Sequence, residues 1–292
     1  MALLVAVLTA SPLRAADDPQ WEWARAAIAD LDYRNVLKRY EPLRVEAAEG
    51  SPEWTEATFC VALAHQHTQP LSKPAIDEAT RLYEQVASKS KDDRYVARAI
   101  MNIGRILELR DFKGDVIDLP GAHDKYRQVL DRFPDAPTAG EAALRAGAAL
   151  VSAYDAPSFT SVRQGVAEIE AYLAARPNDP YASMMWQYVA DTYFIPLGDA
   201  ANAVRCYEQV DKLGWTDKGN QGPSYWRISQ LAERELKQPD LAAKYYAKII
   251  TETPNSGKAY EAMVALQRLG RPVPQTMLFK NVPTTLPTEG KR

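Results

Sequence analysis

The amino-acid sequence predicts an all-α fold: an α-solenoid of about six antiparallel helix pairs, followed by a C-terminal capping helix. Three observations support this prediction. A tyrosine-centred pattern recurs six times, its centres (residues 40, 83, 126, 169, 207 and 246) are 43, 43, 43, 38 and 39 residues apart, and a second pattern alternates with it. A regular step of this size is typical of stacked helical repeats, which bury their apolar faces against one another.

The first pattern is a small residue, three positions, a tyrosine, two positions and an aliphatic residue. Its copies are Val36-x3-Tyr40-x2-Leu43, Ala79-x3-Tyr83-x2-Val86, Ala122-x3-Tyr126-x2-Val129, Gly165-x3-Ile169-x2-Tyr172, Ala203-x3-Tyr207-x2-Val210 and Ala242-x3-Tyr246-x2-Ile249. We expect the tyrosine rings to pack in the core between units, with each hydroxyl reaching a polar edge.

Helical spacing of apolar residues places each copy on a helix, called here a B helix. Residues 75–86, for example, put Ile76, Ala79, Leu82, Tyr83 and Val86 on one stripe. The signals for helix starts are Pro74, Asp199 and Pro239. The signals for helix ends are Pro134, Pro177 and Pro254, each five residues after the aliphatic position.

The second pattern predicts an A helix before each B helix, and Trp21 and Trp23 open the first one. Its copies are Trp186-x2-Val189-Ala190-x2-Tyr193, Ile100-x2-Ile103-Gly104-x2-Leu107, Ala143-x2-Ala146-Gly147-x2-Leu150, Ile228-x2-Leu231-Ala232 and the degenerate Trp54-x2-Ala57-Thr58-x2-Val61. Glycine or alanine after the aliphatic position lets the paired helix approach closely.

Both patterns together resemble the tetratricopeptide repeat family, whose signature is W-x2-L-G-x2-Y…A-x3-F…P. The resemblance covers about residues 20–268 and implies a right-handed solenoid, with residues 16–270 as one repeat domain. The family's unit has about 34 residues, whereas these have 38 to 43. We expect the surplus in loops at residues 67–73, 111–119 and 155–161. HEAT-type repeats are closer in length but lack the paired A and B patterns.

Residues 1–15 have the character of a signal peptide, which predicts a periplasmic or secreted protein. Residues 2–9 are almost wholly apolar, and Ala15 fits the position before a cleavage site. The segment lacks a positive n-region, so an N-terminal helix docked on the first repeat is the alternative. The apolar run is too short to span a bilayer.

The two ends of the array and its cysteines have simple interpretations. Residues 259–269 predict the capping helix, closed by Gly270, and residues 271–292 predict a proline-rich, disordered tail. Met277-Leu278-Phe279 docking on the last helices is the alternative for the tail.

Cys60 and Cys206 lie three units apart, so we expect two buried apolar residues and no disulfide.

The composition favours a binding protein over an enzyme or a nucleic-acid binder. The chain has 292 residues, 46% hydrophobic and 25% charged, and a net charge of −3 with mixed signs, so no basic stripe is present. Phosphate-loop, G-x-S-x-G and H-E-x-x-H motifs are absent. His65 and His67 face apart on a helix, and we expect His123 to point to solvent. The sequence predicts neither a cofactor nor a metal.

The resemblance implies that A helices line a concave groove that binds a protein or peptide. The residues expected to point into this groove are Phe59, Arg98, Met101, Asn102, Arg105, Arg145, Gln187, Tyr188, Asp191, Trp226, Gln230 and Glu233. From the N-terminal to the C-terminal residues of this set, the charge of the groove changes from basic to acidic. A partner segment whose charge changes from acidic to basic in the same direction would complement it. The carboxylate clamp of some family members is not assigned, since only Arg145 has a comparable position.

Two functions follow from this interpretation. The first is an exported scaffold or adaptor that binds a protein segment within an envelope-associated assembly. The alternative is a recruiting subunit for a polysaccharide- or peptidoglycan-active enzyme, which exposed aromatic side chains in the groove would favour. The sequence identifies neither the partner nor the oligomeric state.

Overall fold

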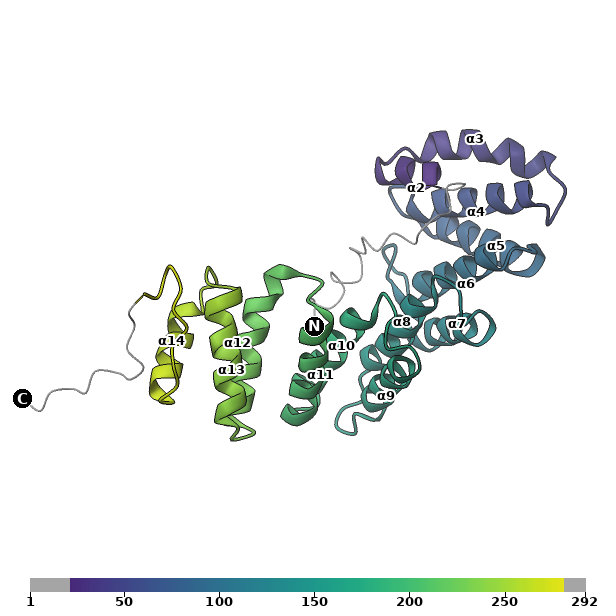
Figure 1. Cartoon of the computed structure of the whole chain (residues 1–292). Helices are drawn as coiled ribbons and strands as arrows, with labels where there is room; N and C mark the ends of the chain where they lie inside the picture. Colours follow the sequence, from purple (N-terminus) through teal and green to yellow (C-terminus); the bar gives the residue numbers. More distant parts are fainter. Residues whose placement is uncertain (1–21, 281–292) are drawn as a thin grey trace, which may run out of the picture. The chain divides into compact units, whose positions relative to one another are not determined.

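The computed structural model describes residues 22–280, which form thirteen α-helices, α2 to α14, and no strand. Consecutive helices pack in antiparallel pairs (Figure 1), so the all-α prediction is confirmed. The predicted signal peptide and residues 281–292 lie outside the described range. Within that range, no helix combines the length and apolar character needed to cross a bilayer.

The chain divides into two compact units, Met1–Tyr181 (unit 1) and Ala182–Arg292 (unit 2), and each is described by itself. The helices of unit 1 are α2 (Glu22–Ala29), α3 (Tyr33–Glu46), α4 (Pro52–His67), α5 (Lys73–Lys89), α6 (Asp93–Glu108), α7 (Leu119–Arg132), α8 (Ala139–Ser152) and α9 (Thr160–Ala175). Those of unit 2 are α10 (Ala182–Phe194), α11 (Ala200–Leu213), α12 (Lys218–Arg234), α13 (Pro239–Glu252) and α14 (Ala259–Arg268). Even-numbered helices from α2 to α12 correspond to the predicted A helices, odd-numbered ones to the B helices, and α14 to the predicted capping helix.

Local sequence signals explain where the helices begin and end. The side chains that cap a helix by accepting a backbone N–H are Ser51, Asp92, Asp118, Asp199 and Asp217. The predicted start signals are confirmed, since Pro74 and Pro239 lie in the first turns of α5 and α13. The stop prolines are also confirmed, because α7, α9 and α13 each end two residues before one.

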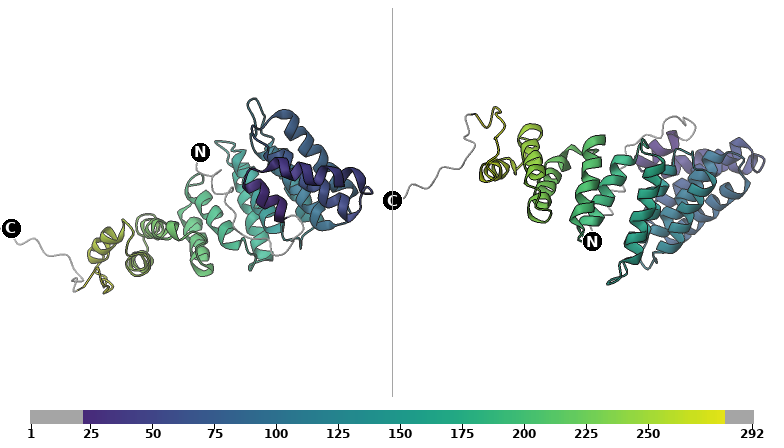
Figure 2. Two further views of the ribbon diagram at one scale, coloured as in Figure 1. Left: turned by 90° about the horizontal axis from the view of Figure 1, so that it is seen from above. Right: turned by 60° about the horizontal axis from the view of Figure 1, so that its bottom comes forward.

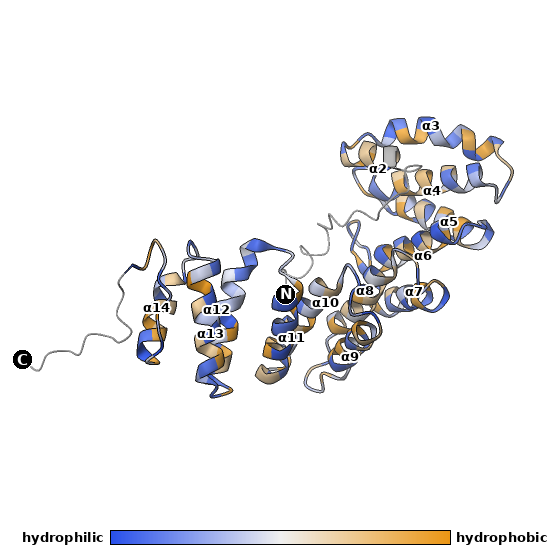
Figure 3. Cartoon of the chain, in the orientation of Figure 1, coloured by the Kyte–Doolittle hydropathy of each residue, from blue (hydrophilic) through white to orange (hydrophobic). Residues whose placement is uncertain are grey.

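Each helix lies beside the next one in chain order inside its unit, and the views of Figure 2 agree on this. Figure 3 shows hydrophobic and hydrophilic residues interleaved along the helices, as expected of amphipathic segments that bury one face. The three loops predicted to hold the surplus residues connect α4 to α5, α6 to α7 and α8 to α9.

The repeated tyrosines are core residues, as predicted. Tyr83, Tyr126, Tyr207 and Tyr246 have no exposed surface, and Tyr40 is 3% exposed. The small residues one turn earlier, such as Ala79 and Ala122, are also fully buried. Burial of an aromatic ring at this repeated position therefore stabilises the packing of the helix pairs in both units.

Glycine in the A helices permits close helix contact, also as predicted. A Cβ atom added at Gly104 would lie 2.6 Å from a ring carbon of Tyr126. One added at Gly147 would lie 2.5 Å from Cγ1 of Ile169 and 2.6 Å from the carbonyl oxygen of Gly165. Since real Cβ atoms do not approach so closely, α6–α7 and α8–α9 could not pack as they do with a side chain there.

The described segment after α14 packs on the rest of unit 2 near its start and is exposed further along. Gly270 has a φ of +63°, which suits its predicted role of ending α14. Val273 is buried, and Arg271 pairs with Asp240 at the start of α13. Met277 and Leu278 are 88% and 62% exposed, so they do not dock as the alternative prediction proposed.

Candidate functional site

Most predicted groove residues of unit 1 are buried. Phe59 and Met101 are each 1% exposed, and Arg98, Asn102 and Arg145 are also buried. The ring of Phe59 packs edge-on against Tyr83 and Tyr95, with centroid distances of 5.5 and 5.4 Å. The structure therefore places these side chains in the packed interior and does not present them to a partner.

Two of the three arginines predicted to make this region basic, Arg105 and Arg145, form ion pairs inside unit 1. Arg105 Nη2 donates to Glu141 Oε1 at 2.6 Å, and Arg145 donates to the same oxygen at 2.7 Å through Nε. Arg145 Nη1 donates to Glu108 Oε2 at 2.9 Å, and Tyr126 donates to that oxygen at 2.6 Å. Two positive and two negative groups thus form one mostly buried, neutral network between α6 and α8, in which Arg105 is the most exposed member.

The acidic end of the predicted groove is also paired. In unit 2, Arg227 Nη1 on α12 donates to Asp191 Oδ1 on α10 at 2.6 Å. Arg268 Nη2 on α14 lies 2.5 Å from Glu233 Oε1 on α12. The predicted change from basic to acidic therefore has to be corrected, because Arg105, Arg145, Asp191 and Glu233 each have an opposite charge beside them.

A hydrogen bond from the repeated tyrosine recurs along the chain. Each of four hydroxyls contacts an oxygen near the end of the preceding A helix, and the acceptors of Tyr83, Tyr126, Tyr207 and Tyr246 are Gln66, Glu108, Asp191 and Glu233, respectively. Tyr40 differs, since its hydroxyl reaches Glu56 on the following helix at 3.4 Å. Sequence reasoning predicted a polar edge but not these acceptors, whose signal is an acid or amide 13 to 18 residues before the tyrosine.

We expect Tyr207→Phe to lower the free energy of unfolding by about 1 kcal/mol, because the half-buried Asp191 loses one donor but keeps Arg227. Burial raises the pKa of Asp191 above its ordinary value even with both donors present. Chemical denaturation followed by circular dichroism measures the loss. Tyr260→Phe, at an exposed tyrosine of the same unit, serves as the control and should change stability little.

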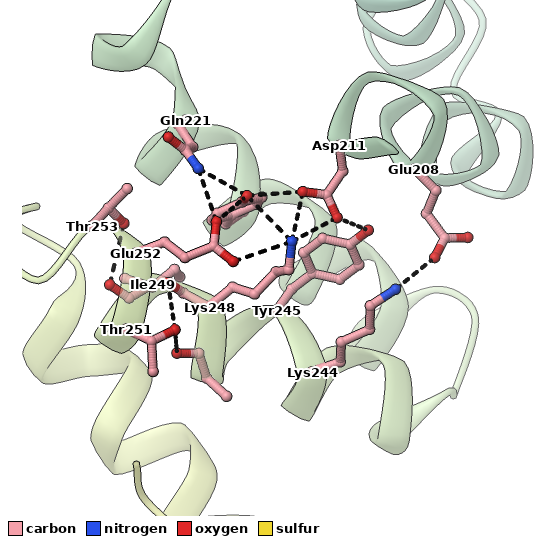
Figure 4. Close-up of polar contacts among 12 residues, drawn as sticks. Glu208, Asp211, Gln221, Lys244, Tyr245, Lys248, Ile249, Thr251, Glu252 and Thr253 are labelled. Atoms are coloured by element: carbon pink, nitrogen blue, oxygen red, sulfur yellow. Dashed lines mark hydrogen bonds and ion pairs between the residues drawn. The ribbon is translucent and has the colours of Figure 1, made fainter. Parts of the chain in front are cut away.

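A second polar cluster joins three helices of unit 2 (Figure 4). Lys248 Nζ on α13 donates to both oxygens of Asp211 on α11, at 2.7 and 2.8 Å. The hydroxyl of Tyr225 on α12 lies 2.8 Å from Asp211 Oδ1 and 2.7 Å from Glu252 Oε2. Gln221 donates to both Tyr225 and Glu252 at 2.9 Å. These contacts fix α11, α12 and α13 to one another, and burial raises the pKa of Tyr225 to about 12.

Acid should weaken the buried network of unit 1. Burial by itself raises the pKa of Glu141, but Arg105 and Arg145 hold it below the ordinary value of 4.5. A lowered folded-state pKa adds stability above the unfolded-state value, and this stability is lost as the pH falls through the folded-state value. We expect melting temperatures to drop as the pH falls below about 4.5, and Glu141→Gln to flatten that dependence. The exposed Glu84→Gln serves as the control and should leave the slope unchanged.

The predicted groove residues of unit 2 lie differently from those of unit 1. All six (Gln187, Tyr188, Asp191, Trp226, Gln230 and Glu233) are half-buried, and they are called here the A-helix face of unit 2. Trp226 packs edge-on against Tyr246 at 5.5 Å, with Lys258 Nζ 5.2 Å from its ring centroid. Gln230 donates to the Tyr246 hydroxyl. The face thus combines two partly exposed aromatic rings, two amides and two acids that are already paired.

Comparisons with known proteins do not extend these observations: no family model matches the sequence, and no curated protein matches it significantly. The function therefore has to be argued from the residues themselves.

The remaining candidate residues have structural surroundings. Nε2 of His123 lies 3.1 Å from Glu168 Oε2, and the side chain is 16% exposed, so the expectation that it points to solvent is wrong. Cys60 and Cys206 are both fully buried, as predicted. Within residues 22–280, no three His, Cys, Asp or Glu side chains gather in a way that could hold a metal ion.

Two surface hollows in the described part of unit 1 contain no predicted site residue. One of about 280 Å³ lies between α7 and α9, over Ala143 and Ala146. The other, of about 330 Å³, lies between α5 and the loop that follows α6, against Ile106 and Phe112. Both have charged rims of mixed sign.

Proposed function

We propose that this chain is a tetratricopeptide-like scaffold, a right-handed α-solenoid that binds a protein or peptide segment on the A-helix face of unit 2. The repeated tyrosine contact and the close glycine contacts support the repeat interpretation. The observation that carries the binding proposal is the contrast between the units: five of the six predicted groove residues are buried in unit 1, whereas all six are half-exposed in unit 2.

The chemistry of the face suggests the kind of segment it binds. Asp191 and Glu233 are neutralised by Arg227 and Arg268, so the face does not select a strongly charged partner. Tyr188 and Trp226 offer apolar contact area, and aromatic residues are the anchors that dominate many interfaces. The amides can donate to and accept from a peptide backbone. A segment with apolar anchors and little net charge fits this face best.

Exchange of face residues tests the proposal. We expect a pull-down with the full chain to recover one defined partner, and Gln187→Ala combined with Trp226→Ala to reduce recovery at least about tenfold, as for a hot-spot residue. Lys212→Ala, at an exposed position on α11 of the same unit, is the matched control. Equal recovery by the wild type and the double variant would exclude this face. Charge reversal at Arg105 or Arg145 is a poor test, because it would break the buried network.

Export and a place in the cell envelope remain part of the proposal. They are supported by the apolar residues 2–9 and by the small residue Ala15 before Ala16. Mass spectrometry of the protein purified from its native cells should find Ala16 at the N-terminus. An N-terminus at Met1 or Ala2 would contradict export by cleavage.

The alternative function, recruitment for an enzyme that acts on polysaccharide or peptidoglycan, has one observation in its favour. Trp186 and Trp226 are partly exposed, each with a cation near its ring: Arg205 at 5.8 Å and Lys258 at 5.2 Å. The repeated tyrosines give no support, because they are buried. Binding of the purified protein to a glycan array, lost on Trp186→Ala, would favour this alternative.

A further inference from the structure

The outer face of α14 has no helix packed against it in the described part of unit 2, although it carries apolar side chains. α14 is the last helix that the structure describes, and it packs on α13 (Figure 1), with Ala259, Ala262 and Leu266 among its buried residues. On the opposite side, Tyr260 is 67% exposed and Val264 is half-buried. Terminal repeats usually end in a polar surface for solubility, so this face is atypical of an end cap.

The charges on this face follow a self-complementary order. Glu261 lies one turn before Val264 and Arg268 one turn after it, and positions i, i+3 and i+7 share one face of a helix. Glu261 is 44% and Arg268 is 56% exposed, and each has an ion-pair partner in its own chain: Lys258 Nζ lies 3.1 Å from Glu261 Oε1, and Arg268 Nη2 contacts Glu233. Glu261 can keep Lys258 and accept a further donor, because a carboxylate has two acceptor oxygens. When two copies of such a helix lie antiparallel and the two-fold axis passes between Val264 and Ala265, Glu261 of each copy faces Arg268 of the other.

We propose that α14 is a homodimer contact, in which the outer faces of two copies pack antiparallel about a two-fold axis. Val264 and Tyr260 supply the apolar centre, and two Glu261–Arg268 pairs, equivalent by symmetry, close its edges. Arg268 keeps its contact with Glu233, since a guanidinium has five N–H donors and only Nη2 is needed there. Tyr260 lies beside Arg268 of the second copy, a favourable cation–aromatic arrangement.

The size of the surface sets the expected strength. α14 has ten residues and is therefore about 15 Å long. One face of so short a helix buries less area than the roughly 800 Å² per partner of a standard interface. The exposed Met277 and Leu278 follow within ten residues and add apolar area at the same end of unit 2. We therefore expect a weak dimer, with a dissociation constant in the range of about 1 to 100 µM.

Two charge reversals test the pairing directly. In Glu261→Arg the dimer brings the introduced arginine against Arg268, and in Arg268→Glu it brings Glu261 against the introduced glutamate, so each homodimer carries the repulsion twice. In a mixed dimer of the two variants, one copy carries arginine and the other carries glutamate at both position 261 and position 268. Every cross-dimer pair then joins opposite charges. Sedimentation of the full chain should show dimerisation of the wild type, a dissociation constant raised at least about tenfold for each variant, and near wild-type association of the mixture.

The controls separate a lost contact from a lost fold. Circular dichroism of each variant should match the wild type, and Glu84→Arg, at an exposed position in unit 1, should dimerise normally. A wild type that remains monomeric at the highest concentration, or a mixture that associates no better than either variant alone, would overturn the proposal.

Discussion

Replacing Arg145 with methionine is expected to lower the free energy of unfolding by about 3–5 kcal/mol, the cost of leaving one side of a buried ion pair without its partner. Arg145 is 7% exposed, and it contacts both Glu108 and Glu141. Methionine keeps much of the apolar part of the arginine side chain, so the loss of stability comes mainly from removal of the positive charge. Chemical denaturation followed by circular dichroism measures it.

A double variant provides the control for this result. Arg145→Met with Glu108→Gln leaves Arg105 paired with Glu141 and Tyr126 with an amide acceptor, so no carboxylate stays uncompensated. We expect the double variant to recover a large part of the lost stability. A single variant within about 1 kcal/mol of the wild type would show that the network adds little.

The second large effect is expected at the closest helix contact. Gly147→Ala should cost about 1–3 kcal/mol, because the new methyl group would lie 2.6 Å from the carbonyl oxygen of Gly165 and would push α8 and α9 apart. The sign of the stability change is informative, because alanine inside a helix is otherwise more stable than glycine by about 1 kcal/mol.

Gly257 gives the matched control. It lies in the turn before α14, its φ is not positive, and no atom lies within 4 Å of an added Cβ. Gly257→Ala should therefore leave stability within about 0.5 kcal/mol of the wild type. A stabilising effect of Gly147→Ala would mean that the helices separate easily, and that the small residue is not required for packing.

Much of the fold could be predicted from the sequence, because its signals are local and repeated. Tyr83, Tyr126, Tyr207 and Tyr246 mark one buried position in successive pairs, and helix-stop prolines follow three of the B helices. The helix starts at Asp199 and Pro239 also follow from neighbouring residues. Such signals need no knowledge of distant contacts.

The candidate site was less predictable, because its properties depend on residues about one repeat apart. Arg105 meets Glu141 after 36 positions, Arg145 meets Glu108 after 37, and Asp191 meets Arg227 after 36. The sequence contained a usable signal, an opposite charge one repeat away in the adjacent A helix.

Burial on the A helices was also outside the reach of the sequence pattern. Phe59 and Met101 have the spacing of side chains that flank the core, but in the structure they are packed inside it. Their equivalents in unit 2 stay half-exposed. Helical spacing gives the direction of a side chain from its helix, whereas its exposure depends on what covers that side.

Site-specific photo-cross-linking tests the central claim, that the A-helix face of unit 2 binds a protein segment, most directly. A photoreactive residue replaces Gln187 on this face in one variant and Lys212 on α11 in another, and both full chains are irradiated in their native cells. We predict a discrete cross-linked partner from position 187 and none from position 212. The same products from both positions, or none from position 187, would contradict the account.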